Sequence, residues 1–362
     1  MEIRGLGLGG FEPVRIQSMT STPTTNVEAT LAQIRRLEAA SCELMRLAVP
    51  DNEAMQAFAE IRQRTNLPLI ADIHFDYRLA LAAIKVGADK IRLNPGNIGG
   101  ADRALQVARE AASQGVPLRI GVNSGSVEKD LLKKYGGPTP EALVESALRH
   151  LELLSPVPDL QIVLSLKASD VLTTIEAYRS ISEKTDWPLH LGITEAGTPF
   201  AGAIRSAVGI GTLLAEGIGD TLRVSLTGDV VEEVKVGWEI LRSLGLRRRG
   251  VELISCPTCG RVEVDLIGIA TKVEKALEDI KQPLRVAVMG CAVNGPGEAR
   301  GADVGVACGK GKGLIFKRGE ILRQVLEEKI VEELIKEVKT LLAEEAIGSA
   351  ILAKTQRTLR RK

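Results

Sequence analysis

The chain has 362 residues, 44% of them hydrophobic and 26% charged, a composition typical of globular proteins and a length that suits two domains. Its 47 basic and 46 acidic residues leave a net charge of +1, which argues against a nucleic-acid partner but not against a local anion site. No apolar run approaches the roughly 20 residues of a membrane helix, and the first residues lack a signal-peptide pattern, so we expect a cytoplasmic protein. Disulfides are rare in that compartment, and the five cysteines therefore need another explanation.

The first ten residues contain Gly5, Gly7 and Gly10 in the spacing G-x-G-x-x-G. In a dinucleotide-binding site this spacing follows a strand and opens a helix, but here almost no chain precedes it and a strand-like run follows. We therefore predict a turn in an N-terminal hairpin, which plugs the floor of the barrel described next.

From Val14 to Leu244 eight short runs rich in β-branched residues alternate with longer amphipathic segments. Apolar residues recur in those segments at three- and four-residue intervals, which predicts helices that cover a sheet. Eight strand–helix units predict an α/β fold, a (β/α)8 TIM barrel over residues 1–244, whereas a doubly wound sheet typically has six strands. The predicted strands are Val14–Thr20, Cys42–Val49, Pro68–Phe75, Asp89–Pro95, Pro117–Ser124, Gln161–Ala168, Pro188–Glu195 and Thr221–Gly228.

Polar side chains occur where these strands end, the face at which TIM barrels place their active sites. Five strands carry a cation there, and five converging cations repel one another unless an anion binds. Guanidinium groups match phosphate oxygens, so a phosphate or diphosphate is the expected ligand, and the one glutamate among the cations is a candidate for proton transfer. The candidates are Arg46, Asp72, His74, Arg92, Arg119, Asn123, Lys167, Glu195, Arg223 and Ser225.

After a six-residue linker, 245–250, the pattern restarts and predicts a smaller α+β domain over residues 251–346. Its predicted helices are Leu266–Ile280 and Leu322–Glu345, with strands before, between and after a glycine-rich loop. Residues 347–362 are basic and are expected to form a C-terminal tail with frayed structure.

Cys256 and Cys259 form a C-x-x-C pair at the start of this domain. A structural zinc site normally requires a second such pair or two histidines, but only the single residues Cys291 and Cys308 follow, and no histidine lies beyond His190. Three thiolates with an irregular third spacing favour an iron–sulfur cluster.

The fourth ligand of such a cluster stays open on the residues alone. Cys308 offers a thiol, and Glu298 ends a glycine-rich loop that could wrap closely around a cluster; the two fit equally well. Asp303 and an open iron position are further alternatives.

The motifs resemble those of the GcpE (IspG) family of 4-hydroxy-3-methylbut-2-enyl diphosphate synthases of the methylerythritol phosphate isoprenoid pathway. The matching segments lie in order along nearly the whole chain: IQSMTST, KIRLNPGNIG, GVNSGS, SLKASD, GITEAG, RVSLTGD, SCPTCGR and CAVNGPGE. The chain departs from the family in having Cys308 in a glycine-rich stretch, and it lacks the long insert of plant-type members.

The resemblance implies a 4Fe-4S cluster on Cys256, Cys259 and Cys291, with Glu298 as the fourth ligand. Glu195 would be the acid/base candidate, and Asn294 would lie near the substrate hydroxyl. The diphosphate would be held by Arg46, Arg92, Arg119 and Lys167, with help from Asn123, Arg223 and Ser225.

The implied reaction is the reductive ring opening of 2-C-methyl-D-erythritol 2,4-cyclodiphosphate, in which two electrons enter, water leaves and a linear allylic diphosphate results. A carboxylate binds iron more weakly than a thiolate does, so Glu298 could yield its place to a substrate oxygen. No nicotinamide or flavin motif is present, so the electrons are expected from a partner protein, which the resemblance implies to be a ferredoxin or flavodoxin.

Linker length predicts a head-to-tail homodimer. The last barrel helix runs antiparallel to the strands and ends at the barrel floor, and six linker residues span at most about 20 Å. The second domain therefore cannot easily reach its own barrel mouth, whereas each could cap its partner's in a closed two-fold pair.

Two rival hypotheses remain. One is a barrel lyase or aldolase with a structural zinc domain, in which Lys167 forms a Schiff base. The other is a non-enzymatic electron-relay or interaction module. Brown colour with broad visible absorption excludes the first, and turnover of the cyclic diphosphate excludes the second.

Overall fold

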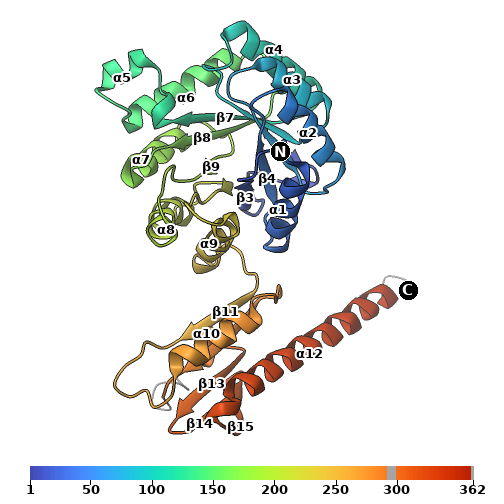
Figure 1. Ribbon diagram of the computed structural model, residues 1–362, viewed down its shortest axis with the longest axis vertical. Coiled ribbons are helices and arrows are strands. Elements are labelled where there is room, and N and C mark those ends of the chain that lie inside the picture. The colour runs from blue at the N-terminus through green and yellow to red at the C-terminus, as the bar shows by residue number, and fades with distance from the viewer. Residues whose placement is uncertain (292–298, 360–362) are drawn as a thin grey trace. The chain divides into compact units, whose positions relative to one another are not determined.

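The computed structural model describes the backbone of residues 1–291 and 299–359, and the side chains of residues 1–291, 299 and 301–346. The chain divides into two compact units, Met1–Arg247 and Arg248–Lys362. In Figure 1 the first unit runs from blue to yellow and the second is orange and red. Each unit is described by itself.

Eight parallel strands form the core of the first unit, in the order β8-β7-β6-β5-β4-β3-β10-β9. A bridge between Leu164 on β8 and Leu189 beside β9 links the two ends of this sheet, so the strands form a barrel and the predicted TIM-barrel fold is confirmed. The strands are β3 (Arg15–Met19), β4 (Leu44–Ala48), β5 (Leu69–Asp72), β6 (Lys90–Leu93), β7 (Leu118–Asn123), β8 (Ile162–Lys167), β9 (His190–Leu191) and β10 (Thr221–Leu222).

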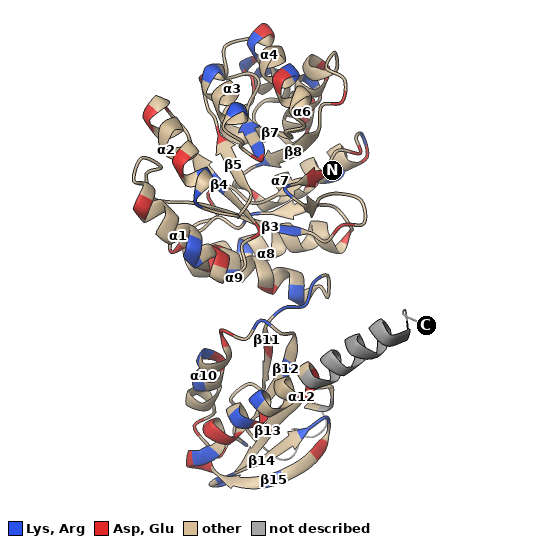
Figure 2. Ribbon diagram, turned by 90° about the vertical axis from the view of Figure 1, so that its right-hand side faces the viewer, with Lys and Arg blue, Asp and Glu red and all other residues tan. Residues whose placement is uncertain are grey.

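Helices follow the strands and cover the outside of the barrel (Figure 1), and charged residues occur along them (Figure 2). Six of them begin at an Asn, Asp or Thr whose side chain accepts a backbone N–H, which satisfies a donor that the first turn leaves unpaired. The helices are α1 (Val27–Ala39), α2 (Asn52–Gln63), α3 (Tyr77–Lys85), α4 (Ala101–Ser113), α5 (Lys129–Tyr135), α6 (Pro140–Leu154), α7 (Val171–Ser182), α8 (Pro199–Ala215) and α9 (Val230–Ser243).

The barrel floor is apolar and closed by the N-terminal hairpin, as predicted. Strands β1 (Glu2–Ile3) and β2 (Leu6–Gly7) pair antiparallel. Ile3 and Leu8 are fully buried, and they form one cluster with three inward residues of the barrel strands, Leu44, Ile70 and Val163. The interior therefore changes from apolar at the floor to charged at the mouth.

The second unit is a five-stranded sheet in the order β11-β12-β13-β14-β15, parallel from β11 to β13 and antiparallel beyond. Its two long helices bury their apolar faces in a single cluster with the sheet, which makes an α+β domain. The elements are β11 (Val251–Ser255), α10 (Leu266–Leu277), β12 (Leu284–Met289), β13 (Val304–Gly309), β14 (Lys312–Lys317), β15 (Glu320–Leu326) and α12 (Ile330–Leu359).

The predicted start of the last helix at Leu322 is wrong, because that residue lies in β15. Arg318 and Gly319 both have positive φ, 49° and 86°, and make the tight turn of a hairpin between β14 and β15. The helix begins instead at Ile330 and continues to Leu359, through residues predicted to form a tail. In the described part of the chain, α12 included, no helix combines the length and the apolar character needed to cross a membrane.

Candidate functional site

A polar cavity of about 140 Å³ lies at the C-terminal ends of the barrel strands. Nine of the ten barrel residues predicted from the sequence line it, and Glu195 does not; Thr194 lines it in its place. The lining residues are Arg46, Asp72, His74, Arg92, Arg119, Asn123, Lys167, Thr194, Arg223 and Ser225.

The two-residue period of β-strands brings these side chains together. On β6, Ile91 and Leu93 pack among the covering helices, so Arg92 between them faces the interior. Gly192 leaves room for the cations: a Cβ there would lie 2.5 Å from Lys167 Nζ and 2.6 Å from the carbonyl oxygen of Arg223.

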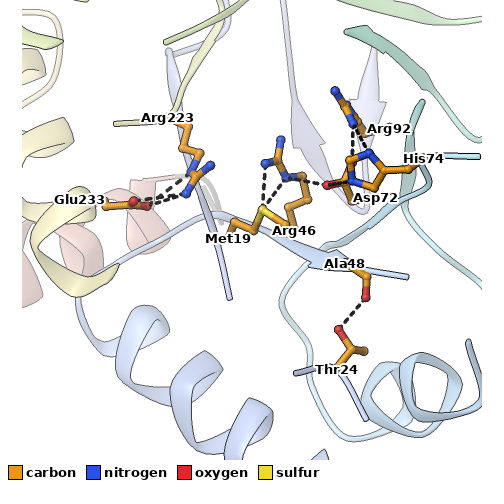
Figure 3. Close-up of polar contacts among 9 residues, drawn as sticks. All are labelled: Met19, Thr24, Arg46, Ala48, Asp72, His74, Arg92, Arg223 and Glu233. Atoms are coloured by element: carbon orange, nitrogen blue, oxygen red, sulfur yellow. Dashed lines mark hydrogen bonds and ion pairs between the residues drawn. The ribbon is translucent and has the colours of Figure 1, made fainter. Parts of the chain in front are cut away.

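Asp72 is the carboxylate that organises one side of the cavity (Figure 3). Its Oδ1 accepts a hydrogen bond from Arg92 at 3.1 Å, and its Oδ2 lies 3.6 Å from Arg46 Nε and 3.3 Å from His74 Nε2. Burial alone would raise the pKa of Asp72, but Arg46, His74 and Arg92 together lower it well below its ordinary value. The carboxylate thus stays ionised and orients two guanidinium groups.

Glu233, on α9, organises the opposite side (Figure 3). It is 3% exposed and forms an ion pair with Arg223 at 3.2 Å, while it also accepts from Ser18 Oγ and the backbone N–H of Leu226. Sequence analysis missed this residue because an acid in the first turn of a helix is usually explained by the helix dipole.

Arg119 and Lys167 are buried cations without a carboxylate partner among the described residues. Arg119 is 2% exposed, and its Nε and Nη1 atoms make no hydrogen bond within the described part of the protein. Burial and the surrounding guanidinium groups lower the pKa of Lys167 well below its ordinary value. The four guanidinium groups of the site outnumber the carboxylates Asp72 and Glu233 even without a charge on Lys167, so the cavity favours an anion.

Glu195 lies on the loop after β9 and is exposed. Its φ of 53° is unusual for a residue other than glycine. Counting inward positions in steps of two from His190 leads to Thr194, a signal in the sequence that would have identified the lining residue.

Cys256 and Cys291 lie at one edge of the sheet in the second unit. Cys256 directly follows β11, and Cys291 lies two residues after the end of β12. The two strands are parallel neighbours, and their last paired residues are Ser255 and Val288. The backbone N–H of Gly290 donates to Cys256 Sγ at 3.1 Å.

Cys259 is exposed on the loop after β11, and the backbone N–H and side chain of Arg261 lower its pKa, which favours the thiolate. Among the described residues no three His, Cys, Asp or Glu side chains are arranged to hold a metal ion. The predicted site residues Asn294 and Glu298 lie outside the described residues.

Cys308 is more deeply buried than these three cysteines. It lies on β13, is fully buried and packs in the apolar cluster beneath α10 and α12. Burial raises the pKa of this thiol to about 12. Cys42 in the barrel is likewise buried, so both behave as small hydrophobic residues.

The fold and these residues define a class of protein: a TIM barrel with a cationic mouth, joined to a small α+β domain that carries cysteines at one sheet edge. The family profile of the GcpE TIM-barrel domain matches residues 1–238, and that of the GcpE protein C-terminal domain matches residues 252–340. The chain belongs to the GcpE family, and the resemblance found in its sequence motifs is confirmed.

Named relatives match the chain over most of its length. A protein of Clostridium tetani named 4-hydroxy-3-methylbut-2-en-1-yl diphosphate synthase (flavodoxin) is 58% identical over 334 residues, 92% of this chain and 96% of its own. A protein of the same name from Caldanaerobacter subterraneus subsp. tengcongensis is 58% identical over 338 residues, 93% of this chain and 95% of its own. A solved dihydropteroate synthase of Yersinia pestis, 15% identical over 64% of this chain and 93% of its own, has a TM-score of 0.47, which is too low to bear on function.

Proposed function

We propose that the protein catalyses the two-electron reductive ring opening of 2-C-methyl-D-erythritol 2,4-cyclodiphosphate to 4-hydroxy-3-methylbut-2-enyl diphosphate, with loss of water. The observation that carries this proposal is the excess of buried cations in a small cavity of a GcpE-family barrel. A cyclic diphosphate supplies the missing negative charge in a compact form. The two relatives of this chain described above are named as synthases of the same linear diphosphate.

The barrel residues bind and orient the diphosphate. Arg119, which lacks a carboxylate partner among the described residues, supplies unbalanced charge, and a bound anion would favour the charged form of Lys167. Arg46 and Arg92 are held in place by Asp72 before the ligand arrives, so little reorganisation accompanies binding. Arg223, fixed by Glu233, closes the opposite side, and Asn123, Ser225 and His74 offer further polar contacts.

Cys256, Cys259 and Cys291 would hold a 4Fe-4S cluster, with Glu298 as the fourth ligand. The donor set fits: two of the thiols share one sheet edge, the thiolate of Cys259 is favoured, and Cys256 accepts a backbone N–H, as sulfur ligands of iron–sulfur clusters commonly do. When bound, the cluster supplies the electron transfer that C–O bond cleavage requires. The buried Cys308 is not a member of this set.

Proton transfer is assigned to Glu195, with Asn294 near the substrate hydroxyl. Glu195 is exposed, and its neighbour Thr194 lines the cavity, so its loop borders the site. A carboxylate at this border could exchange a proton with the departing oxygen. The electron donor is proposed to be a flavodoxin, the protein that the relatives' names carry, with a ferredoxin as the alternative.

The active form is proposed to be the head-to-tail homodimer that linker length predicts. Co-expression of Glu195→Ala with Cys256→Ser chains tests it, since each variant alone is inactive. If each active site combines the barrel of one chain with the second domain of its partner, the mixed dimer has one site without either substitution, and activity is restored. If each active site is formed within a single chain, every site carries one of the two substitutions. An inactive mixture would therefore contradict the proposed head-to-tail arrangement.

Anaerobic purification, followed by iron, sulfide and zinc analysis and visible spectroscopy, tests the redox function. We expect iron and sulfide with a broad absorption that a chemical reductant bleaches. Addition of the cyclic diphosphate should restore the absorption, because the substrate takes the electrons. A colourless protein with stoichiometric zinc would contradict the proposal and support the lyase alternative.

A further inference from the structure

Lys90 is a buried amine below the mouth of the barrel that the binding of the diphosphate, as described, does not use. Its neighbour on β6, Ile91, packs among the covering helices, so Lys90 faces the interior like Arg92 two residues later. It pairs in register with Ile70, a residue of the apolar floor. The side chain is fully buried and is not part of the cavity lining. Lys90 thus stands between the floor and the cations of the mouth.

Nothing in the described part of the chain compensates a charge on this amine. Lys90 Nζ makes no hydrogen bond there, and both amide atoms of the equally buried Gln17 are also without partners. The charged groups that act on Lys90 are Arg119 on β7 and Arg46 on β4, and both are cations. A buried ammonium among cations is strongly disfavoured.

The other ionisable groups of the interior do not change this balance. Asp72 on β5 is engaged by Arg46, Arg92 and His74, and Glu233 is engaged by Arg223. Lys167 on β8 and His190 on β9 are basic groups whose own pKa values burial and the neighbouring cations lower, so neither supplies a negative charge, and His190 Nδ1 already shares a hydrogen bond with Thr221 at 2.8 Å. Burial, Arg119 and Arg46 together hold the pKa of Lys90 well below 10.5, so the free protein favours the uncharged amine.

A bound diphosphate reverses this situation because it places at least two negative charges against Arg119 and Arg46. We propose that Lys90 is an inner cation of the diphosphate site: its amine is uncharged in the free protein and takes up a proton when the cyclic diphosphate binds above it. This inference rests on the proposed function. It assigns to Lys90 a positioning role, since the new ammonium attracts the bound anion across the barrel interior without touching it.

The proposal makes two predictions of opposite sign for Lys90→Met, which keeps the length of the side chain and removes the amine. The diphosphate should bind about tenfold or more weakly, the loss expected for a charged partner. The ligand-free variant should melt higher by about 2–4 °C, because a buried group without partners is gone. A lysine that served as an ordinary structural cation would lower the melting temperature when replaced.

The pH dependence follows from proton counting. The unfolded chain protonates Lys90 below about pH 10.5 and the folded free protein does not, so wild-type stability falls as the pH drops below that value. The stability advantage of Lys90→Met should therefore grow from pH 10 to pH 7. Binding takes up a proton, so wild-type affinity should increase as the pH falls, more steeply than that of the variant.

Titration calorimetry on the anaerobically purified full chain, cluster included, measures the proton uptake directly. The cyclic diphosphate and inorganic diphosphate are each titrated in two buffers of different ionisation enthalpy, which gives the number of protons bound per ligand. Wild type should take up more protons than Lys90→Met, by up to about one per site, the maximum for a single amine. Lys85→Met, the same change at an exposed lysine of α3, should match the wild type.

The outcomes distinguish a failure of the role of Lys90 from a failure of the proposed function. Equal proton uptake by wild type and Lys90→Met, with tight binding in both, overturns the role of Lys90 and leaves the proposed function intact. Failure of wild type to bind either diphosphate overturns both. Lys90→Gln serves as a second neutral variant, and a lower melting temperature or failure to fold in both variants also contradicts the role of Lys90.

Discussion

At the scale of single residues, the site contains two kinds of basic residue: those paired with a carboxylate, and those without a carboxylate partner among the described residues. Asp72 and Glu233 hold Arg46, Arg92 and Arg223 in place. Arg119 and Lys167 have no carboxylate partner in the described part of the chain: the guanidinium charge of Arg119 is available to a ligand, and a bound anion would favour the charged form of Lys167. The two groups should respond differently to substitution.

Arg119→Leu should weaken binding of the cyclic diphosphate by about 2–5 kcal/mol, the cost of removing one member of a buried charge pair. The visible spectrum and the stability of the free protein should be preserved, because the removed guanidinium lacks partners among the described residues. Calorimetry on the variant measures the loss. Arg179→Leu, at an exposed arginine of α7, is the control, and wild-type affinity in Arg119→Leu would move the anion site elsewhere.

Asp72→Asn should instead destabilise the free protein by about 3–5 kcal/mol, because it leaves buried guanidinium groups uncompensated. The folded pKa of Asp72 is below the unfolded value of 3.8, so its contribution is complete above that value and is lost only as the pH falls through the lower folded one. Denaturant unfolding should therefore show a constant difference from wild type between pH 5 and pH 8. A difference that shrinks within this range would contradict the account.

Cys308→Ser should keep the iron content and the visible absorption, since the thiol is fully buried in the apolar cluster beneath α10 and α12. Some loss of stability is expected from burying a hydroxyl. Cys256→Ser is the matched change at a proposed ligand and should abolish the absorption. Loss of the cluster in Cys308→Ser would exclude Glu298 as the fourth ligand.

At the scale of elements, the two-residue period of β-strands allowed most of the residues that line the cavity to be predicted from the sequence. Every barrel strand was predicted from its composition, and TIM-barrel geometry then placed nine lining residues at one face. Three residues were missed for physical reasons. Glu233 lies on a helix, Thr194 directly precedes the more conspicuous Glu195 on the loop after β9, and Lys90 lies one step below the strand ends where sites are sought.

Gly192→Ala tests this geometry at the residue that directly follows β9. The new Cβ would meet Lys167 Nζ and the carbonyl oxygen of Arg223, so one of them must shift, at a cost of about 1–3 kcal/mol in stability. Diphosphate binding should weaken as Lys167 is displaced. Gly211→Ala on α8, where a Cβ meets nothing within 4 Å, should be neutral or slightly stabilising, and equal behaviour of the two variants would count against the close packing.

At the scale of the whole molecule, the sequence predicted two domains of different kinds, and the structure shows two compact units of those kinds. The misplaced start of the last helix shows the limit of periodicity: only the three residues Glu327–Lys329 separate β15 from α12, so strand and helix patterns merge in the sequence. The turn at Arg318 and Gly319 was the missed signal. The fourth cluster ligand depended on family resemblance, because residue chemistry alone favoured a thiol and a carboxylate equally.

The central claim joins the anion site of the barrel to the cysteines of the second unit in one reaction. Phosphorus NMR of the cyclic diphosphate, incubated anaerobically with the full chain and reduced flavodoxin, tests it most directly. The signals of the ring should give way to those of a linear diphosphate with wild type, and Arg119→Leu and Cys256→Ser should each stop the conversion. An unchanged ring with wild type, in a preparation whose iron and sulfide contents are complete, would contradict the account.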